Sequence, residues 1–99
     1  MDGGLRSGPV SRLVRTLGPP FERRVVKVAP GSERAFDRSE WLDAIVVVEC
    51  GEIELVSLHD ARAGFAAGDV LYLCGLPLRA LRNRGREPVM LSVISRHRR

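Results

Sequence analysis

The sequence predicts an all-β domain, either a β-sandwich or a closed barrel, and two observations support this fold class. From Phe21 onward, short segments rich in Val, Ile and Leu recur along the chain, and turn residues separate them about every 8–12 residues. The chain has 99 residues, of which 44% are hydrophobic. This is the length of one small domain, with enough apolar side chains to form a core.

The expected strands follow one another in order, each closed by a turn. They cover residues 21–29, 44–49, 52–58, 62–66, 70–74, 79–83 and 88–95. Pro30-Gly31 closes the first strand, Cys50-Gly51 has the residues of a tight hairpin turn, and Gly85 is expected in another hairpin loop. The run from Ile45 to Val48 is apolar at every position, so we expect it to be buried on both of its faces.

The first 20 residues differ from the rest of the chain because they are rich in glycine and proline, which predicts a mostly irregular N-terminal arm. Within the arm, Ser11 is a candidate N-cap, and Leu13, Val14 and Leu17 have helical spacing. This stretch could form a short helix or a strand that pairs with another subunit. We therefore divide the chain into an arm (1–20), a β-barrel (21–96) and a basic tail (97–99).

The charge and composition narrow the classes of partner. The net charge is +4 and the pI is about 10.0, but the arginines are scattered and only the tail forms a cluster, so nucleic-acid binding is not expected.

No apolar run approaches the roughly 18 residues of a membrane span, and the N-terminus lacks a secretory signal, which favours the cytoplasm. Cys50 and Cys74 are expected to be reduced. A chain this short buries a modest fraction of its surface, so we expect a homodimer.

The spacing of turn residues resembles the two motifs of the cupin superfamily, whose members are small jelly-roll barrels. Gly31 and Gly51 fall on the glycine positions of the first motif, and Gly68 and Asn83 fall on the first and last positions of the second. The resemblance covers about residues 21–96. It implies a single-domain jelly-roll, or double-stranded β-helix, barrel.

The resemblance also marks four positions that hold metal ligands in this family. Here they are occupied by Asp37, Ser39, Ala44 and Arg79. Arginine is a cation that does not ligate metals, and alanine offers no ligand at all. The two histidines, His59 and His97, fall in a predicted turn and in the tail. We therefore expect neither a metal nor another cofactor.

Arg79 is the most informative of these replacements because its position faces the barrel interior in the family. A buried guanidinium needs a partner. It could pair with Asp37, Asp43 or Glu40 as a structural fastener, or it could hold the carboxylate or phosphate of a ligand. The candidate ligand-binding residues share these two motifs and are Arg79, Asp37, Ser39, Tyr72 and Trp41. No catalytic residue can be assigned.

Three functional interpretations follow. The first is a metal-free cupin-like domain that binds a small anionic ligand or serves as a regulatory or accessory module. The second is a metal-independent isomerase or cyclase in which Asp37 is the acid or base and Arg79 holds the substrate. The third is a structural or protein-interaction domain with a filled barrel. The enzyme interpretation is weakened because the predicted core contains no histidine.

Overall fold

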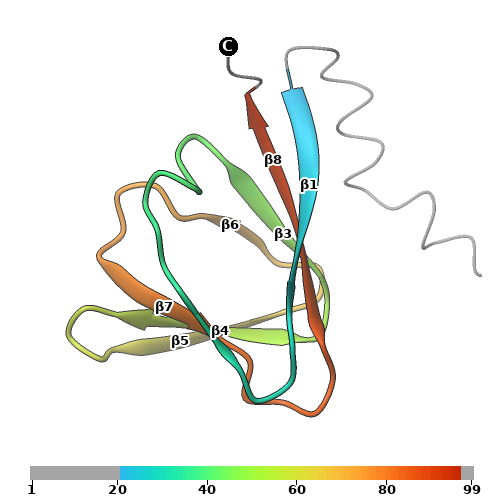
Figure 1. Ribbon diagram of the computed structural model, residues 1–99, viewed down its shortest axis with the longest axis vertical. Helices are drawn as coiled ribbons and strands as arrows, with labels where there is room; N and C mark the ends of the chain where they lie inside the picture. Colours follow the sequence, from blue (N-terminus) through green and yellow to red (C-terminus); the bar gives the residue numbers. More distant parts are fainter. Residues whose placement is uncertain (1–20, 97–99) are drawn as a thin grey trace, which may run out of the picture.

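The computed structural model describes residues 21–96 as two four-stranded antiparallel sheets that pack face to face (Figure 1). The strands are β1 (Phe21–Val28), β2 (Glu33–Ala35), β3 (Ile45–Cys50), β4 (Glu52–Ser57), β5 (Arg62–Ala66), β6 (Val70–Tyr72), β7 (Leu78–Arg82) and β8 (Val89–Arg96). Residues 21–96 contain no helix. The all-β prediction is confirmed, while the predicted arm and tail lie outside the described residues.

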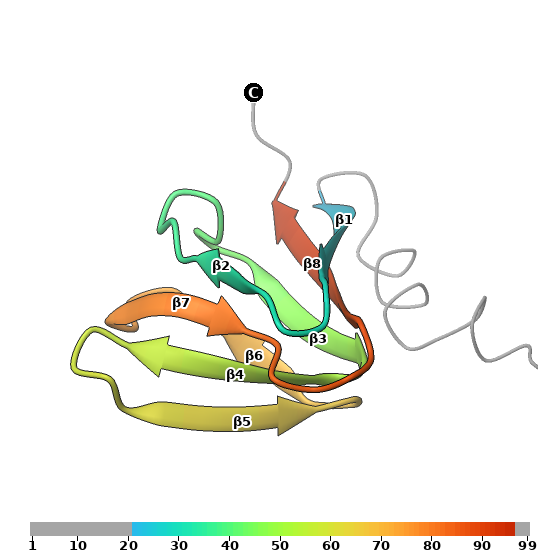
Figure 2. The same cartoon turned by 60° about the horizontal axis from the view of Figure 1, so that its bottom comes forward.

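The strand order is that of a jelly roll. Sheet A runs β1-β8-β3-β6 and sheet B runs β2-β7-β4-β5. Every connection along the chain crosses from one sheet to the other, except the β4–β5 hairpin, which stays within sheet B (Figure 2). The predicted barrel architecture is therefore present, with each sheet assembled from strands that are distant in sequence.

Two predicted hairpins are wrong because their strands belong to different sheets. Gly51 joins β3 to β4 and Gly85 lies between β7 and β8, and neither pair of strands is hydrogen-bonded. Gly51 is still required at its corner. Its φ is +84°, and a Cβ there would lie 2.8 Å from the carbonyl oxygen of Pro88. A turn between sheets and a hairpin turn call for the same residue, so composition alone does not separate them.

The core fills the space between the two sheets with aliphatic side chains. Alternation along each strand places one set inward, and the inner residues of both sheets form a single cluster. Its members include Val26, Val46, Leu55, Leu81 and Leu91. The side chains that line the barrel interior are therefore apolar.

Strand β3 departs from its prediction. Val46 and Val48 face the core and are fully buried, whereas Ile45 on the outer face is 37% exposed and Val47 is half-buried. The apolar run was expected to be buried on both faces. It is instead fully buried on the inner face and only partly covered on the outer one.

Asn83 closes one end of the barrel, as the motif predicts for a strand-end residue. Its buried side-chain amide donates to the carbonyl oxygens of Val28 (3.0 Å) and Glu87 (2.8 Å), and its Oδ1 accepts from the Gly85 N–H (2.9 Å). The backbone N–H of Gly31, a residue with φ +74°, also donates to the Asn83 carbonyl oxygen at 2.8 Å. These bonds tie the end of β1 to the connection between β7 and β8.

Residues 21–96 contain only strands, turns and loops, so this part of the chain has no helix that could cross a membrane.

Candidate functional site

Asp37 and Ser39 lie together in the loop between β2 and β3, but they face solvent. The backbone N–H and the hydroxyl of Ser39 both donate to Asp37 Oδ1, at 3.0 and 2.8 Å. These bonds, the side-chain bond first, hold the pKa of the Asp37 carboxyl below its ordinary value. The pair forms an Asx-type turn that shapes the loop.

Arg79 lies on the outside of the barrel, so the expectation that it faces the interior is wrong. Val56 pairs with Ala80 while the next residue, Ser57, pairs with Leu78, which makes Arg79 the extra residue of a β-bulge in β7. Leu78 packs against the core, and the bulge turns the Arg79 side chain to the outer face of sheet B.

The partners of Arg79 also differ from those expected. Its guanidinium pairs with Asp60 at 2.8 Å and with Glu33 at 3.8 Å. Of the acids expected to pair with it, Asp37 is bonded to Ser39, and Glu40 is bonded to two other arginines. Arg79 therefore has its carboxylate partners on the outer surface, half-exposed to solvent.

The residues at the family's metal-ligand positions do not fit a metal ion. Ala44 is fully buried and offers a methyl group, Arg79 is a cation turned outward, and Asp37 and Ser39 are bonded to each other in an exposed loop. Within residues 21–96, no group of three or more His, Cys, Asp or Glu side chains is placed to hold a metal.

The two aromatic candidates lie in different places. Tyr72 is on the outer face of sheet A and 55% exposed. A hydrogen bond with the Cys74 side chain is the main cause that raises the pKa of the Tyr72 hydroxyl. Trp41 is fully buried at the inner side of the β2–β3 loop. Of the five predicted ligand-binding residues, only Asp37 and Ser39 are in mutual contact.

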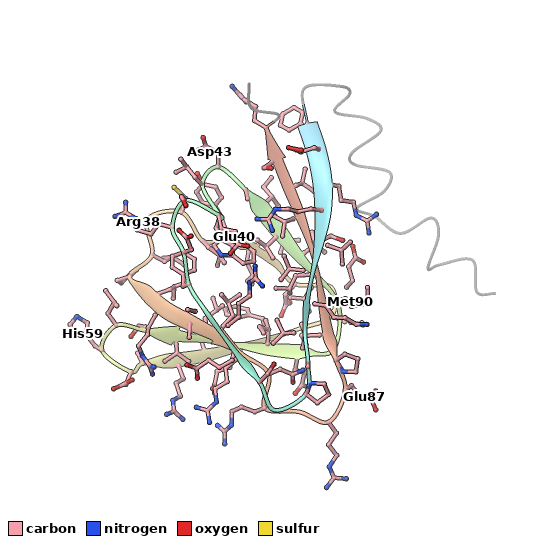
Figure 3. The ribbon with its side chains drawn as sticks, viewed as in Figure 1. Arg38, Glu40, Asp43, His59, Glu87 and Met90 are labelled. Carbon is pink, nitrogen blue, oxygen red and sulfur yellow. The ribbon has the colours of Figure 1, made fainter. Side chains whose placement is uncertain are left out.

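A different group of residues converges at the barrel mouth. Arg24 lies on β1 opposite Val93, and Arg34 lies on β2 opposite Leu81, so both occupy inward-facing positions. Both arginines pair with the same Glu40 carboxylate: Arg24 at 3.6 Å, and Arg34 through a short hydrogen bond from one Nη. Figure 3 shows Glu40 on the inner side of its loop, while Arg38 and Asp43 point away from the barrel.

Aromatic rings complete this group, which we call the mouth cluster: Arg24, Arg34, Phe36, Glu40 and Trp41. Phe36 and Trp41 stack with their centroids 6.5 Å apart and an interplanar angle of 13°. The Arg24 guanidinium lies 5.4 Å from the centroid of Trp41, in cation–π distance, and it also donates to the Glu40 carbonyl oxygen at 2.7 Å.

The mouth cluster has unused hydrogen-bonding capacity. Two guanidinium groups share one carboxylate, which leaves one positive charge in excess. Among the described residues, the buried Nε of Arg34 and Nε1 of Trp41 have no hydrogen-bond partner. An unpaired buried N–H is unfavourable, and a native protein usually satisfies it with a partner, a water or a ligand. Both unsatisfied groups are donors, so the arrangement suits an anion.

Comparison with known proteins supports the assignment of the fold. Comparison with protein-family models gives no match, and neither does comparison with curated proteins. Among solved structures, a Cupin 2 conserved barrel domain protein from Salinispora arenicola is 30% identical over 82% of this chain and 66% of its own, with a TM-score of 0.56. This chain belongs to the cupin superfamily.

Two further structures show the breadth of cupins that resemble this one. A sugar phosphate isomerase of the cupin superfamily from Silicibacter pomeroyi is 25% identical over 80% of this chain and 52% of its own, with a TM-score of 0.56. ToxT from Vibrio cholerae, solved bound to (E)-4-(8-methylnaphthalen-1-yl)but-3-enoic acid, has a TM-score of 0.62 at 13% identity, over 80% of this chain and 31% of its own. This cupin spans less than two thirds of the length of all three proteins.

Two clefts lined by described residues of this cupin lie outside the barrel, on sheet B. The larger, of about 370 Å³, is bordered by Glu52, Glu54, Arg82 and Arg84. Its acidic and basic side chains balance, and Arg84 already pairs with Glu54 at 3.5 Å. The cleft therefore offers no net charge to select a ligand.

The two arginines of the mouth cluster were not among the predicted site residues. The predicted residues lie in the motifs that hold metal ligands in other cupins, whereas Arg24 and Arg34 lie on β1 and β2. The signal that could have found Arg34 is its place three residues after Gly31, since a short strand must follow the turn. Glu33–Ala35 is only three residues long and lacks the aliphatic residues of the other strands, so periodicity does not reveal which side chain faces inward.

Proposed function

We propose that this cupin domain binds a small organic carboxylate at the mouth cluster, without a metal. One observation carries the proposal: two half-exposed arginines converge on one glutamate while the Nε of Arg34 stays unpaired. Guanidinium groups bind carboxylates best through two parallel N–H···O bonds. Glu40 uses only one Nη of Arg34, so a ligand carboxylate that displaces Glu40 gains a two-pronged contact through Nε and that Nη.

The rest of the ligand would lie against the aromatic side of the cluster. Phe36, which is half-buried and stacked on the fully buried Trp41, presents apolar surface beside the two guanidinium groups, which favours an anion with an apolar or aromatic body. The aliphatic core, whose members carry no charge, lies below the cluster. The proposed ligand is therefore held at the mouth, with its carboxylate toward Arg34.

One of the comparisons supports the proposed class of ligand. ToxT, which resembles this chain in fold, was solved with a carboxylic acid bound. The resemblance to the sugar phosphate isomerase raises an enzymatic role as the alternative. However, Asp37 and Arg79, the residues that would act in catalysis, do not lie together. Asp37 is bonded to Ser39 in an exposed loop, and Arg79 is paired with Asp60 on the far side of sheet B.

Calorimetric titration with 4-phenylbutyrate and its uncharged amide tests the proposal. We expect the carboxylate to bind and the amide not to bind. Arg34→Gln should weaken binding by at least about tenfold, because it removes a charge-assisted bidentate contact. Glu40→Gln should strengthen binding, because the internal carboxylate no longer competes with the ligand.

Arg79→Gln is the matched control, because Arg79 is also a half-exposed arginine with two acidic partners but lies on the outer face. It should bind 4-phenylbutyrate like the unmodified protein. Equal binding of the amide, or unchanged binding by the Arg34→Gln variant, would contradict a carboxylate site at the mouth.

A further inference from the structure

We infer that the larger cleft on the outer face of sheet B binds an α-amino acid with a basic side chain. The inference is independent of the ligand proposed at the mouth, because the cleft shares no lining residue with the mouth cluster. It rests on three features of the cleft: a carboxylate oxygen without a partner, a guanidinium group without an ion pair, and a hollow that a glycine leaves open.

Glu54 lies at the centre of the cleft, on the outer face of β4. Its neighbours along the strand, Ile53 and Leu55, belong to the core, so the Glu54 side chain points outward. The strand registers place Gly64 of β5 directly opposite Glu54 on one side and Arg82 of β7 on the other. These three residues line the same cleft, whose volume is about 370 Å³.

One oxygen of the Glu54 carboxylate lacks a partner. Its Oε2 lies 3.5 Å from Nη1 of Arg84, which is longer than the roughly 2.7–2.9 Å of a charge-assisted hydrogen bond. Its Oε1 is buried and accepts no hydrogen bond from any of the described residues. A buried acceptor without a partner is unfavourable, and a cationic donor such as an ammonium group satisfies a carboxylate oxygen best.

Gly64 leaves room for such a donor beside Glu54. Its φ is not positive, so the backbone conformation does not require a glycine at this position. A Cβ placed on Gly64 would meet no atom within 4 Å. Glycine inside a strand often marks a site where a ligand approaches the backbone closely. The missing side chain therefore opens a hollow next to Glu54, on the edge strand of sheet B (Figure 2).

Arg82 supplies the opposite charge. Glu33 and Glu54 flank it in the strand registers, but Glu33 pairs instead with Arg79, at 3.8 Å. Within the part of the chain that the structure describes, the Arg82 guanidinium has no ion-pair partner. Its donors are therefore available to a carboxylate group of a ligand.

The two charges of the cleft are close enough to hold one α-amino acid. Cross-strand neighbours such as Glu54 and Arg82 lie about 5 Å apart at Cβ. An ammonium group bound by Glu54 and a carboxylate bound by Arg82 would therefore be as near to each other as the two groups on a single α-carbon. A cleft whose acidic and basic side chains balance suits such a zwitterion.

The acidic side of this surface selects the side chain of the ligand. A second cleft, of about 260 Å³, adjoins the first, since Glu52 and Gly64 line both. Its charged lining residues, Glu52 and Asp69, are both acidic. Glu52 lies two residues from Glu54 on the same face of β4, about 7 Å along the strand, a distance that the four-carbon stem of lysine spans.

Calorimetric titration of the full chain with L-lysine tests the site. We expect L-lysine to bind, and Nα-acetyl-L-lysine and L-lysinamide to bind at least about tenfold more weakly, because each lacks one of the two α-charges. L-norleucine, which lacks the side-chain charge, should bind about two- to fivefold more weakly, because Glu52 is exposed. No binding of L-lysine at millimolar concentrations overturns the inference. Equal binding of the acetylated compound or the amide overturns the zwitterion site, and equal binding of L-norleucine overturns the preference for a basic side chain.

Gly64→Val should abolish binding, because it fills the hollow, and a β-branched residue suits a strand. Ala63→Val is the matched control: Ala63 is the neighbouring exposed residue of β5 and lies on the opposite face, so this variant should bind L-lysine like the unmodified protein. Arg82→Gln should weaken binding at least about tenfold. A thermal melt establishes that each variant is folded, and Glu54→Gln repeats the test if Gly64→Val is not. Binding that these changes in the cleft leave unaltered overturns the inference.

Amide chemical shifts in NMR spectra distinguish the cleft from the mouth, which is proposed to bind carboxylates as well. L-lysine should shift the amide signals of Glu54 and Gly64. Shifts confined to Arg34 and Phe36 would place L-lysine at the mouth. That result would overturn the inference about the cleft and leave the proposed function intact.

Discussion

The two sheets of this cupin have similar inner faces and different outer faces. Inward, both contribute aliphatic residues to one core. Outward, sheet B carries ion pairs, such as Arg79 with Asp60 and Arg84 with Glu54, while sheet A partly exposes the side chains of Val25, Ile45, Val70 and Tyr72. The inner faces explain why the barrel folds. The outer faces differ in polarity and charge.

Truncation of a core side chain should have the largest effect on stability, and it tests whether the inner faces of the two sheets contribute equally to the core. Leu81 in sheet B and Leu91 in sheet A are both fully buried. Each change to alanine should lower the free energy of unfolding by about 2–5 kcal/mol, because it removes buried methyl groups and leaves a cavity. Urea denaturation measures both values. A loss confined to one of the two variants would show that one sheet contributes little to the core.

The connection between the sheets should be almost as sensitive. Asn83→Ala removes three hydrogen bonds that a buried amide makes to Val28, Glu87 and Gly85, and it leaves their backbone groups without this partner. We expect a loss of about 2–3 kcal/mol in urea denaturation. Asn83→Asp should also be destabilising, since a carboxylate cannot donate to the two carbonyl oxygens. Wild-type stability in both variants would contradict a fastening role.

The outer face of sheet B should tolerate change. Arg79 and its partners Asp60 and Glu33 are largely exposed, so their ion pairs contribute little. Arg79→Gln should therefore alter the free energy of unfolding by less than about 1 kcal/mol. A larger loss would mean that the bulge in β7 depends on the charge of this residue, and that sheet B is less independent of its surface pairs than we infer.

The smallest expected effect concerns the loop that leads from sheet B back to sheet A. Because the Asp37 pKa is lowered in the folded state, its contribution to stability is present above the ordinary pKa of 3.8 and is lost as the pH falls through the lower, folded value. Ser39→Ala removes the main cause and should raise the Asp37 pKa toward 3.8. A carboxyl titration by NMR measures the change. An unshifted pKa would mean that Ser39 does not hold this carboxylate.

Most of the fold could be predicted from the sequence because strands and turns are local features. The β5 strand has the predicted bounds, and Gly31 and Asn83 act as the motif implies. The assignment of strands to sheets was less accessible. The residues at Gly51 suit a hairpin and a crossing between sheets equally, and only the pairing of distant strands decides between them.

The candidate site was harder to predict, for a related reason. A single extra residue in β7 reverses the direction of the Arg79 side chain, and no local sequence pattern predicts that bulge. Arg24 and Arg34 point inward because of their register with β8 and β7, which the sequence of β1 or β2 alone does not contain. The motif positions located the mouth of the barrel, but other side chains occupy it.

The pairing of β1 with β8 begins at Phe21 and Arg96, so the two ends of the barrel are neighbours in one ladder. A connection between them would need to bridge only the distance between adjacent strands. The exposed β4–β5 turn around His59, where Ser57 and Asp60 form a compact loop, offers a second place to open the chain. A circularly permuted barrel, joined between residues 21 and 96 and opened at this turn, would therefore keep every strand pairing. It would lose only the covalent link between β4 and β5. The same geometry would let the barrel be inserted as a unit into a surface loop of another protein.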